Sequence, residues 1–201
     1  MARKPRVYFP GAFYHVISRG NQGQMIFHDD VDRERYLSLL REVQTRYGPK
    51  LYAYVLMGNH VHLLMEVGGV PLSKIMQNLQ FRYTRYYNQR YRKIGHLFQG
   101  RYKAILCDRE SYLLELVRYI HLNPVRAGLT RHIDGYRWSS HPIYLRGGEE
   151  RVVSVKAVLE QFGGRRGEAI RQYRKFINDG LGEGHREDYY QVIDQRFLGD
   201  E

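Results

Sequence analysis

The chain has 201 residues, of which 43% are hydrophobic and 26% charged, a composition typical of globular proteins that excludes wholesale disorder. It has 32 Lys and Arg against 21 Asp and Glu, and the resulting net charge of +11 predicts a polyanionic partner such as nucleic acid. The single cysteine excludes an internal disulfide and a cysteine-built zinc site. No apolar stretch is long enough to span a membrane, and no secretory signal is visible, so we expect a cytoplasmic protein without a membrane partner.

Hydrophobic periodicity predicts an alternation of strands and helices along the first 123 residues. We expect strands over 13–18, 51–57, 60–67 and 101–107, and helices over 29–47, 71–91 and 110–123, the last ended by Pro124. The order up to residue 107 is that of a split βαβ sandwich, an α+β fold with a four-stranded antiparallel sheet and two helices on one face. The other sheet face is then expected to be left for a ligand, and the helix over 110–123 is an addition to this core.

The chain beyond this core predicts short helices. Patterns over 155–162 and 167–177 are helical, and the Gly-Gly-Arg-Arg-Gly stretch over 163–167 separates them like a linker. From Asp179 the chain is rich in glycine and charge, so we expect a partly disordered tail.

A strongly basic segment lies in the middle of the sequence. Between Val67 and Cys107 there is no Asp or Glu, while tyrosines alternate with basic residues. Cations that follow phosphates and rings that stack on bases are typical of proteins that hold single-stranded nucleic acid. The alternative is an amphipathic helix with a solvated basic face and a tyrosine-rich core.

The sequence His60-Val61-His62 is a candidate metal site. Side chains two residues apart on a strand share one face about 6.5 Å apart, which lets two imidazoles bind one divalent metal. Glu66 shares that face but lies about 13 Å from His62, too far to join. The alternative is a pair of partly buried histidines satisfied by hydrogen bonds.

The helix expected over 110–123 carries a second candidate group. Tyr119 and Asn123 are one turn apart on the same face, whereas His121 points away from Tyr119. A phenolate can attack phosphorus, and an amide oxygen is a suitable ligand for a hard metal such as Mg²⁺. The alternative for Tyr119 is one more packed tyrosine among the eighteen in the chain.

These motifs together resemble those of the single-tyrosine HUH transposases, and among them the REP-associated tyrosine transposases. The resemblance covers about Tyr8 to Tyr144 and rests on the His-Val-His strand, the basic tyrosine-rich helix, the stretch Gly95–Lys103 and the stretch Tyr119–Gly128. It implies an RRM-like or ferredoxin-like catalytic domain over 1–145 with an added nucleophile helix, followed by a helical extension over 146–201.

The resemblance also implies an activity and the residues that carry it out. One tyrosine would nick single-stranded, hairpin-containing DNA, leaving a 5′-phosphotyrosine and a free 3′-hydroxyl for strand transfer. Tyr119 is then the nucleophile, His60 and His62 bind Mg²⁺ or Mn²⁺, and Asn123 is the third ligand at a position where many relatives have Gln. No nucleotide cofactor is needed. Relatives include monomers and dimers, so a homodimer stays open.

The basic segment then suggests where DNA binds. We expect three arginines to contact phosphates and two further cations to flank the active-site face: Arg82, Arg85 and Arg92, and Arg101 and Lys103.

Two other functions remain open from the sequence. A non-catalytic RRM-like module that binds single-stranded nucleic acid explains the charge and the tyrosines, but not the histidines or the spacing from Tyr119 to Asn123. A hydrolase with zinc at His60 and His62 is the other, yet the chain lacks the Cys-x-x-Cys motif of a nucleic-acid deaminase.

Overall fold

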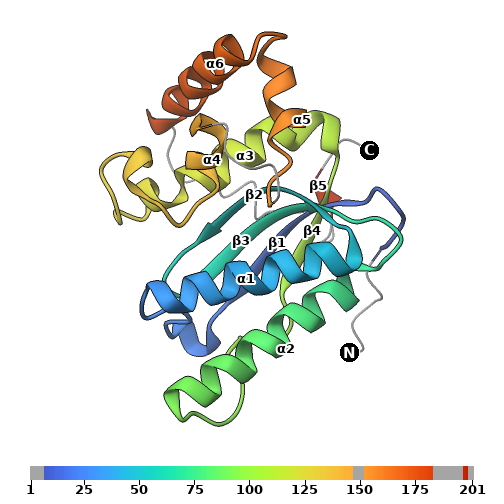
Figure 1. Ribbon diagram of the computed structural model, residues 1–201, viewed down its shortest axis with the longest axis vertical. Helices are drawn as coiled ribbons and strands as arrows, with labels where there is room; N and C mark the ends of the chain where they lie inside the picture. Colours follow the sequence, from blue (N-terminus) through green and yellow to red (C-terminus); the bar gives the residue numbers. More distant parts are fainter. Residues whose placement is uncertain (1–6, 147–151, 183–196, 199–201) are drawn as a thin grey trace.

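The structure, a computed structural model, describes residues 7–146, 152–182 and the backbone of 197–198 (Figure 1). Its core elements follow in the predicted order: β1 (Phe13–Arg19), α1 (Asp30–Tyr47), β2 (Lys50–Leu56), β3 (His60–Glu66), α2 (Leu72–Tyr91) and β4 (Lys103–Cys107). After them come α3 (Arg109–Arg126), α4 (His141–Arg146), α5 (Val155–Leu159), α6 (Arg166–Asp179) and β5 (Phe197–Leu198). The short 3-10 turns are η1 (Asn21–Gly23), η2 (Ile133–Gly135), η3 (Glu160–Phe162) and η4 (Gly180–Gly182).

The strands form one sheet in the order β2-β3-β1-β4-β5. Among the first four, each strand is antiparallel to its neighbours, which confirms the predicted four-stranded split βαβ sheet. The short β5 runs parallel to β4 and extends the sheet by a strand that the sequence did not indicate. Strands β1 and β3 both lie inside the sheet and pair along their whole lengths, with Ile17 opposite His62 and His15 opposite Leu64.

Helices cover both faces of this sheet. Helices α1 and α2 lie on one face, and α3 with the C-terminal helices lies on the other (Figure 1). The expectation of a sheet face left open for a ligand is therefore wrong over much of its area. The reason is apolar side chains such as Phe13, Leu64 and Ile105, which point to the α3 side and are buried there.

The tyrosines of α2 hold this helix against α1. Asp32 is fully buried near the start of α1, where its carboxylate accepts hydrogen bonds from Tyr86 (3.0 Å) and Tyr91 (2.7 Å). It also forms an ion pair with Arg90. Tyr83 is also fully buried and donates to the carbonyl of Ile26. The interpretation of this helix as having a tyrosine-rich core therefore holds for these residues, because their rings pack in or against the core and their hydroxyls form hydrogen bonds within the protein.

Helix α3 is longer than expected. It begins after Asp108, whose carboxylate accepts from the backbone N–H of Ser111 at 3.0 Å, and it runs through Pro124 to Arg126. The expectation that Pro124 ends the helix is wrong. A proline removes one backbone hydrogen bond, but Pro124 is buried with the preceding turn, and the next turn closes through Ala127 N–H bonded to Asn123 O.

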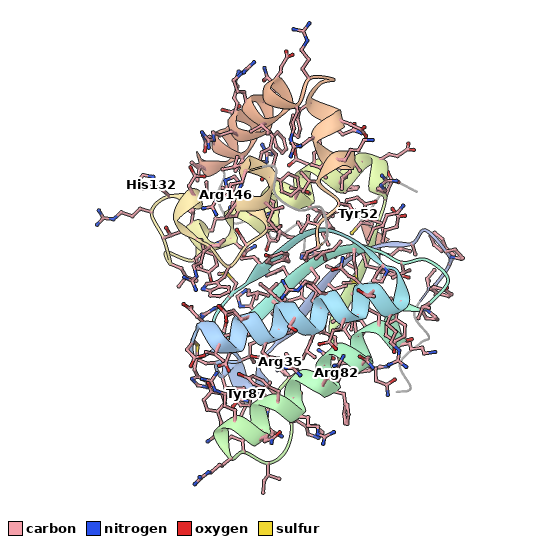
Figure 2. The ribbon with its side chains drawn as sticks, viewed as in Figure 1. Arg35, Tyr52, Arg82, Tyr87, His132 and Arg146 are labelled. Carbon is pink, nitrogen blue, oxygen red and sulfur yellow. The ribbon has the colours of Figure 1, made fainter. Side chains whose placement is uncertain are left out.

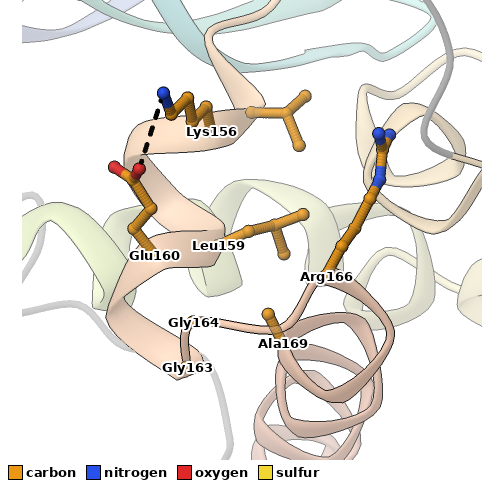
Figure 3. Close-up of a pocket in the computed structure, with 8 residues that line it drawn as sticks. Lys156, Leu159, Glu160, Gly163, Gly164, Arg166 and Ala169 are labelled. Atoms are coloured by element: carbon orange, nitrogen blue, oxygen red, sulfur yellow. Dashed lines mark ion pairs between the residues drawn. The ribbon is translucent and has the colours of Figure 1, made fainter.

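The helices α5 and α6 confirm the two helical patterns expected in the C-terminal part. They enclose a pocket next to Gly163 and Gly164, along which Lys156 and Glu160 form an ion pair of 3.8 Å (Figure 3). Most of the tail expected to be disordered lies outside the described residues, as does the chain over 147–151 at the expected domain boundary. Among the helices described, none is both long and apolar enough to cross a membrane.

Candidate active site

Strand β3 presents two histidines to the α3 side of the sheet. His60 and His62 alternate with the buried Val61 and Leu63, so the two imidazoles share a face, as the strand pattern predicts. Their ring centroids lie 5.0 Å apart and the rings meet edge to face. His62 has no exposed surface, whereas His60, at the strand end, is partly exposed.

The Nδ1 atom of each ring is hydrogen-bonded to a neighbouring residue. His60 Nδ1 donates to Asn59 Oδ1 at 2.7 Å, and His62 Nδ1 lies 2.8 Å from His15 Nε2. Histidines that ligate metals usually have one ring nitrogen engaged in this way, which fixes the ring and directs the other nitrogen to the metal. Nε2 is therefore the atom through which each ring would bind a metal ion.

Burial keeps these imidazoles neutral. It lowers the pKa of His60 to about 4, with the charge of Arg19 as a smaller cause. Burial, followed by the neighbouring His15 and His60, holds the pKa of His62 well below its ordinary value. Neutral imidazole is the form that binds metals, so the electrostatics of the pair fit a metal site.

Helix α3 brings Tyr119 against this pair. Its ring centroid lies 6.0 Å from that of His62, with the rings edge to face. Tyr119 is 1% exposed, and the Arg126 guanidinium lies 5.5 Å from the ring centroid. The tyrosine is therefore next to the histidines but covered, and a phosphate can reach its hydroxyl only after neighbouring side chains move.

Asn123 lies one turn beyond Tyr119 and is largely buried. Its side-chain N–H donates to the backbone carbonyl of Tyr119 at 3.2 Å, which leaves Oδ1 as the amide atom that would bind a metal. Two imidazoles and an amide oxygen suit Mg²⁺ or Mn²⁺. Within the described part of the chain, no three His, Cys, Asp or Glu side chains lie close enough together to hold a metal ion.

His15 is the residue that the sequence did not single out. It lies on β1 and has no exposed surface. Its ring stacks on that of His62 with centroids 5.1 Å apart, and it meets the ring of Tyr119 edge to face with centroids 5.9 Å apart. A histidine inside the apolar strand Phe13–Arg19 was a weak signal. Only the pairing of β1 with β3 shows that it meets His62.

Two other polar residues are outside the site, as expected. Glu66 is at the far end of β3, where Lys50 and the hydroxyl of Tyr52 hold its carboxylate. His121 faces away from Tyr119 and bonds with Tyr173 and Ser140.

The five cations expected to bind DNA do not form one cluster around the histidines. Lys103 is on the same sheet face as His62, since both are paired with Ile17, and burial lowers its pKa. Arg82 lies in the α1 and α2 layer, where it pairs with Glu42 at 2.5 Å (Figure 2). The others are exposed, on α2 or in the loop before β4: Arg85, Arg92 and Arg101.

The fold and the site together define a class of protein. It is a split βαβ sandwich in which an inner strand presents a His-x-His pair to a tyrosine on an added helix. The chain belongs to the family described as "Transposase IS200 like", which it matches over residues 9–123. It is therefore a transposase-type enzyme that acts on DNA, and the resemblance seen in the sequence is confirmed.

Two solved structures are similar to this chain, and one of them shares its fold. One, described as a REP-associated tyrosine transposase bound to a REP hairpin, superimposes with a TM-score of 0.61 at 17% identity, covering 77% of this chain and 92% of the other. A crystal structure of a protein from Deinococcus radiodurans R1 has a TM-score of 0.42 at 21% identity, covering 59% of this chain and 95% of the other. A comparison with curated proteins found no match.

Proposed function

We propose that the protein nicks and rejoins single-stranded, hairpin-containing DNA through a covalent 5′-phosphotyrosine at Tyr119. The observation that carries this proposal is the contact between the Tyr119 ring and His62, because it brings a nucleophile to a pair of neutral imidazoles. The hairpin-bound structural relative supports DNA with a hairpin as the substrate.

Each group in the site has a role in this reaction. The Tyr119 hydroxyl loses its proton as its oxygen attacks phosphorus, the bond from phosphorus to the 3′ oxygen breaks, and that oxygen takes up a proton and leaves as a 3′-hydroxyl, so the protons balance. A 3′-hydroxyl that attacks the phosphotyrosine reverses these steps and releases the tyrosine. His60, His62 and the amide oxygen of Asn123 would hold Mg²⁺ or Mn²⁺, which when bound would supply positive charge beside the scissile phosphate. Neither step requires a nucleotide cofactor.

A covalent protein–DNA complex is the direct test. Labelled single-stranded oligonucleotides with a hairpin are incubated with the protein and Mn²⁺ and separated on a denaturing gel. We expect a shifted band that is absent with chelator and absent in Tyr119→Phe, because phenylalanine has no oxygen to form the ester. Tyr112→Phe, seven residues earlier on α3, is the matched control and should keep the band. A band that persists in Tyr119→Phe rules out this nucleophile.

The near-complete burial of Tyr119 favours one other function, a non-catalytic module that binds single-stranded nucleic acid. The same experiment separates the two. Such a module would shift the oligonucleotide on a native gel, with or without metal, and would give no band under denaturing conditions.

A further inference from the structure

His15 contacts both a proposed metal ligand, His62, and the proposed nucleophile, Tyr119. It lies on β1, diagonally across the strand pair from His62, because Ile17 is the residue opposite His62. Its Nε2 is 2.8 Å from His62 Nδ1, the two rings are within 22° of parallel, and its ring meets that of Tyr119 edge to face. It has no exposed surface. None of the proposed chemical steps uses this side chain directly.

A hydrogen bond between two neutral imidazoles can run in either direction. One ring must donate and the other accept, so the proton positions of His15 and His62 are coupled. If His62 binds a metal through Nε2, its remaining proton is on Nδ1, which must donate to His15 Nε2. His15 then carries its own proton on Nδ1.

The two candidate histidine ligands differ in how the proton on Nδ1 is fixed. His60 Nδ1 faces an amide oxygen of Asn59, which can only accept, so His60 is held in the tautomer that leaves Nε2 for a metal. His62 faces an imidazole, which can accept or donate. Within the described residues, His15 Nδ1 has no hydrogen-bond partner, so only the bond with His62 selects the tautomer of His15.

We propose that His15 is a positioning residue for His62: it accepts the Nδ1 proton of His62, fixes the ring plane and directs Nε2 toward a divalent metal. This inference rests on the proposed function. Because the His15 ring also contacts Tyr119, it sets the spacing between the metal-binding ring and the nucleophile. His15 touches neither substrate nor metal, so its effect passes through His62.

Metal affinity without DNA tests this role separately from catalysis. Mn²⁺ binding is measured by calorimetry for the wild-type protein, His15→Leu and His15→Gln. Leucine fills the space without an acceptor, and we expect Mn²⁺ affinity to fall by about 10- to 100-fold. Glutamine places an acceptor near the position of Nε2 and should restore most of the affinity. The matched control is Ile105→Val, since Ile105 lies opposite His15 on β4 and takes no part in the hydrogen bond.

A second measurement does not depend on the variants folding. Nitrogen NMR of histidine-labelled wild-type protein with Mg²⁺ should show His62 protonated on Nδ1 and His15 protonated on Nδ1. A His62 protonated on Nε2 in the Mg²⁺-loaded protein overturns the proposal.

The outcomes separate this inference from the proposed function. If folded His15→Leu binds Mn²⁺ as tightly as the wild type, the positioning role is wrong, while a covalent band dependent on Tyr119 still upholds the proposed function. If the wild-type protein binds no Mn²⁺, both the positioning role and the metal-dependent mechanism fail. Loss of affinity in His15→Leu with recovery in His15→Gln supports the inference, because a purely structural role would not follow the acceptor.

Discussion

At the scale of single residues, the candidate site is a cluster of one buried tyrosine and three histidines, which come from one helix and two strands. The alternation of a strand is enough to place His60 and His62 on one face, and the turn of a helix is enough to place Tyr119 beside Asn123. His15 has no such local relation to these residues. It is 47 positions from His62, and its contact depends on the register of two strands.

Lys103 is the predicted DNA contact best placed to act near the histidines. It shares their sheet face and is exposed. Burial lowers the pKa of His15 to about 3, and the positive charge of Lys103 is the second cause, so Lys103 lies close to that ring. We expect Lys103→Ala to weaken binding of single-stranded DNA and to reduce the slope of log affinity against log salt by about 0.7, the value for one phosphate contact.

The matched control for Lys103 is Lys50→Ala. Lys50 pairs with Glu66, six strand residues or about 20 Å from His60, so its loss should leave the salt slope unchanged. Equal slopes for the wild type and Lys103→Ala, measured by fluorescence anisotropy at several salt concentrations, would remove Lys103 from the binding surface.

At the scale of elements, the two sides of α3 contact different parts of the molecule. One side carries Tyr119 toward the sheet histidines, and the other carries His121 into a buried group with the C-terminal helices. In that group the Tyr173 hydroxyl of α6 lies 2.8 Å from the Nδ1 atoms of both His121 and His141. The C-terminal helices therefore hold the helix that carries the proposed nucleophile.

Removing the hydroxyl that joins these helices should destabilise the protein. Tyr173→Phe leaves two buried imidazole nitrogens without that partner, and we expect the free energy of unfolding to fall by about 1–3 kcal/mol. Tyr112→Phe, a half-buried tyrosine of α3, should change it by less than about 0.5 kcal/mol. Urea unfolding followed by circular dichroism measures both. Equal stability of Tyr173→Phe and the wild type would show that this group does not fasten α6 to α3.

At the scale of the whole molecule, buried histidines link stability to pH. In the part of the chain that the structure describes, four of them have no exposed surface, and burial lowers the pKa of each: His15, His62, His121 and His141. A histidine with a lowered folded pKa binds its proton more readily in the unfolded chain. The stability it provides is complete above its unfolded pKa of about 6.5 and is lost as pH falls toward the folded value.

We therefore expect the free energy of unfolding to fall steeply below pH 6.5 in the presence of chelator. Each of these histidines contributes up to about 1.4 kcal/mol per pH unit. Urea titrations between pH 7.5 and 5 measure the slope, which should decrease by about that amount in His121→Gln. His132, which is exposed (Figure 2), provides the control, and His132→Gln should leave the slope unchanged. A stability that is flat from pH 7.5 to 5 would contradict this linkage.

The sequence by itself determined the order of the elements from β1 to α3, the shared face of His60 and His62, and the place of Tyr119 one turn before Asn123. These features follow from backbone geometry over a few residues, which periodicity reports directly. The tertiary structure alone decided three others: the burial of the sheet face under α3, the continuation of α3 through Pro124, and the meeting of His15 with His62. Each depends on packing or strand register between segments far apart in the chain, for which local patterns carry no signal.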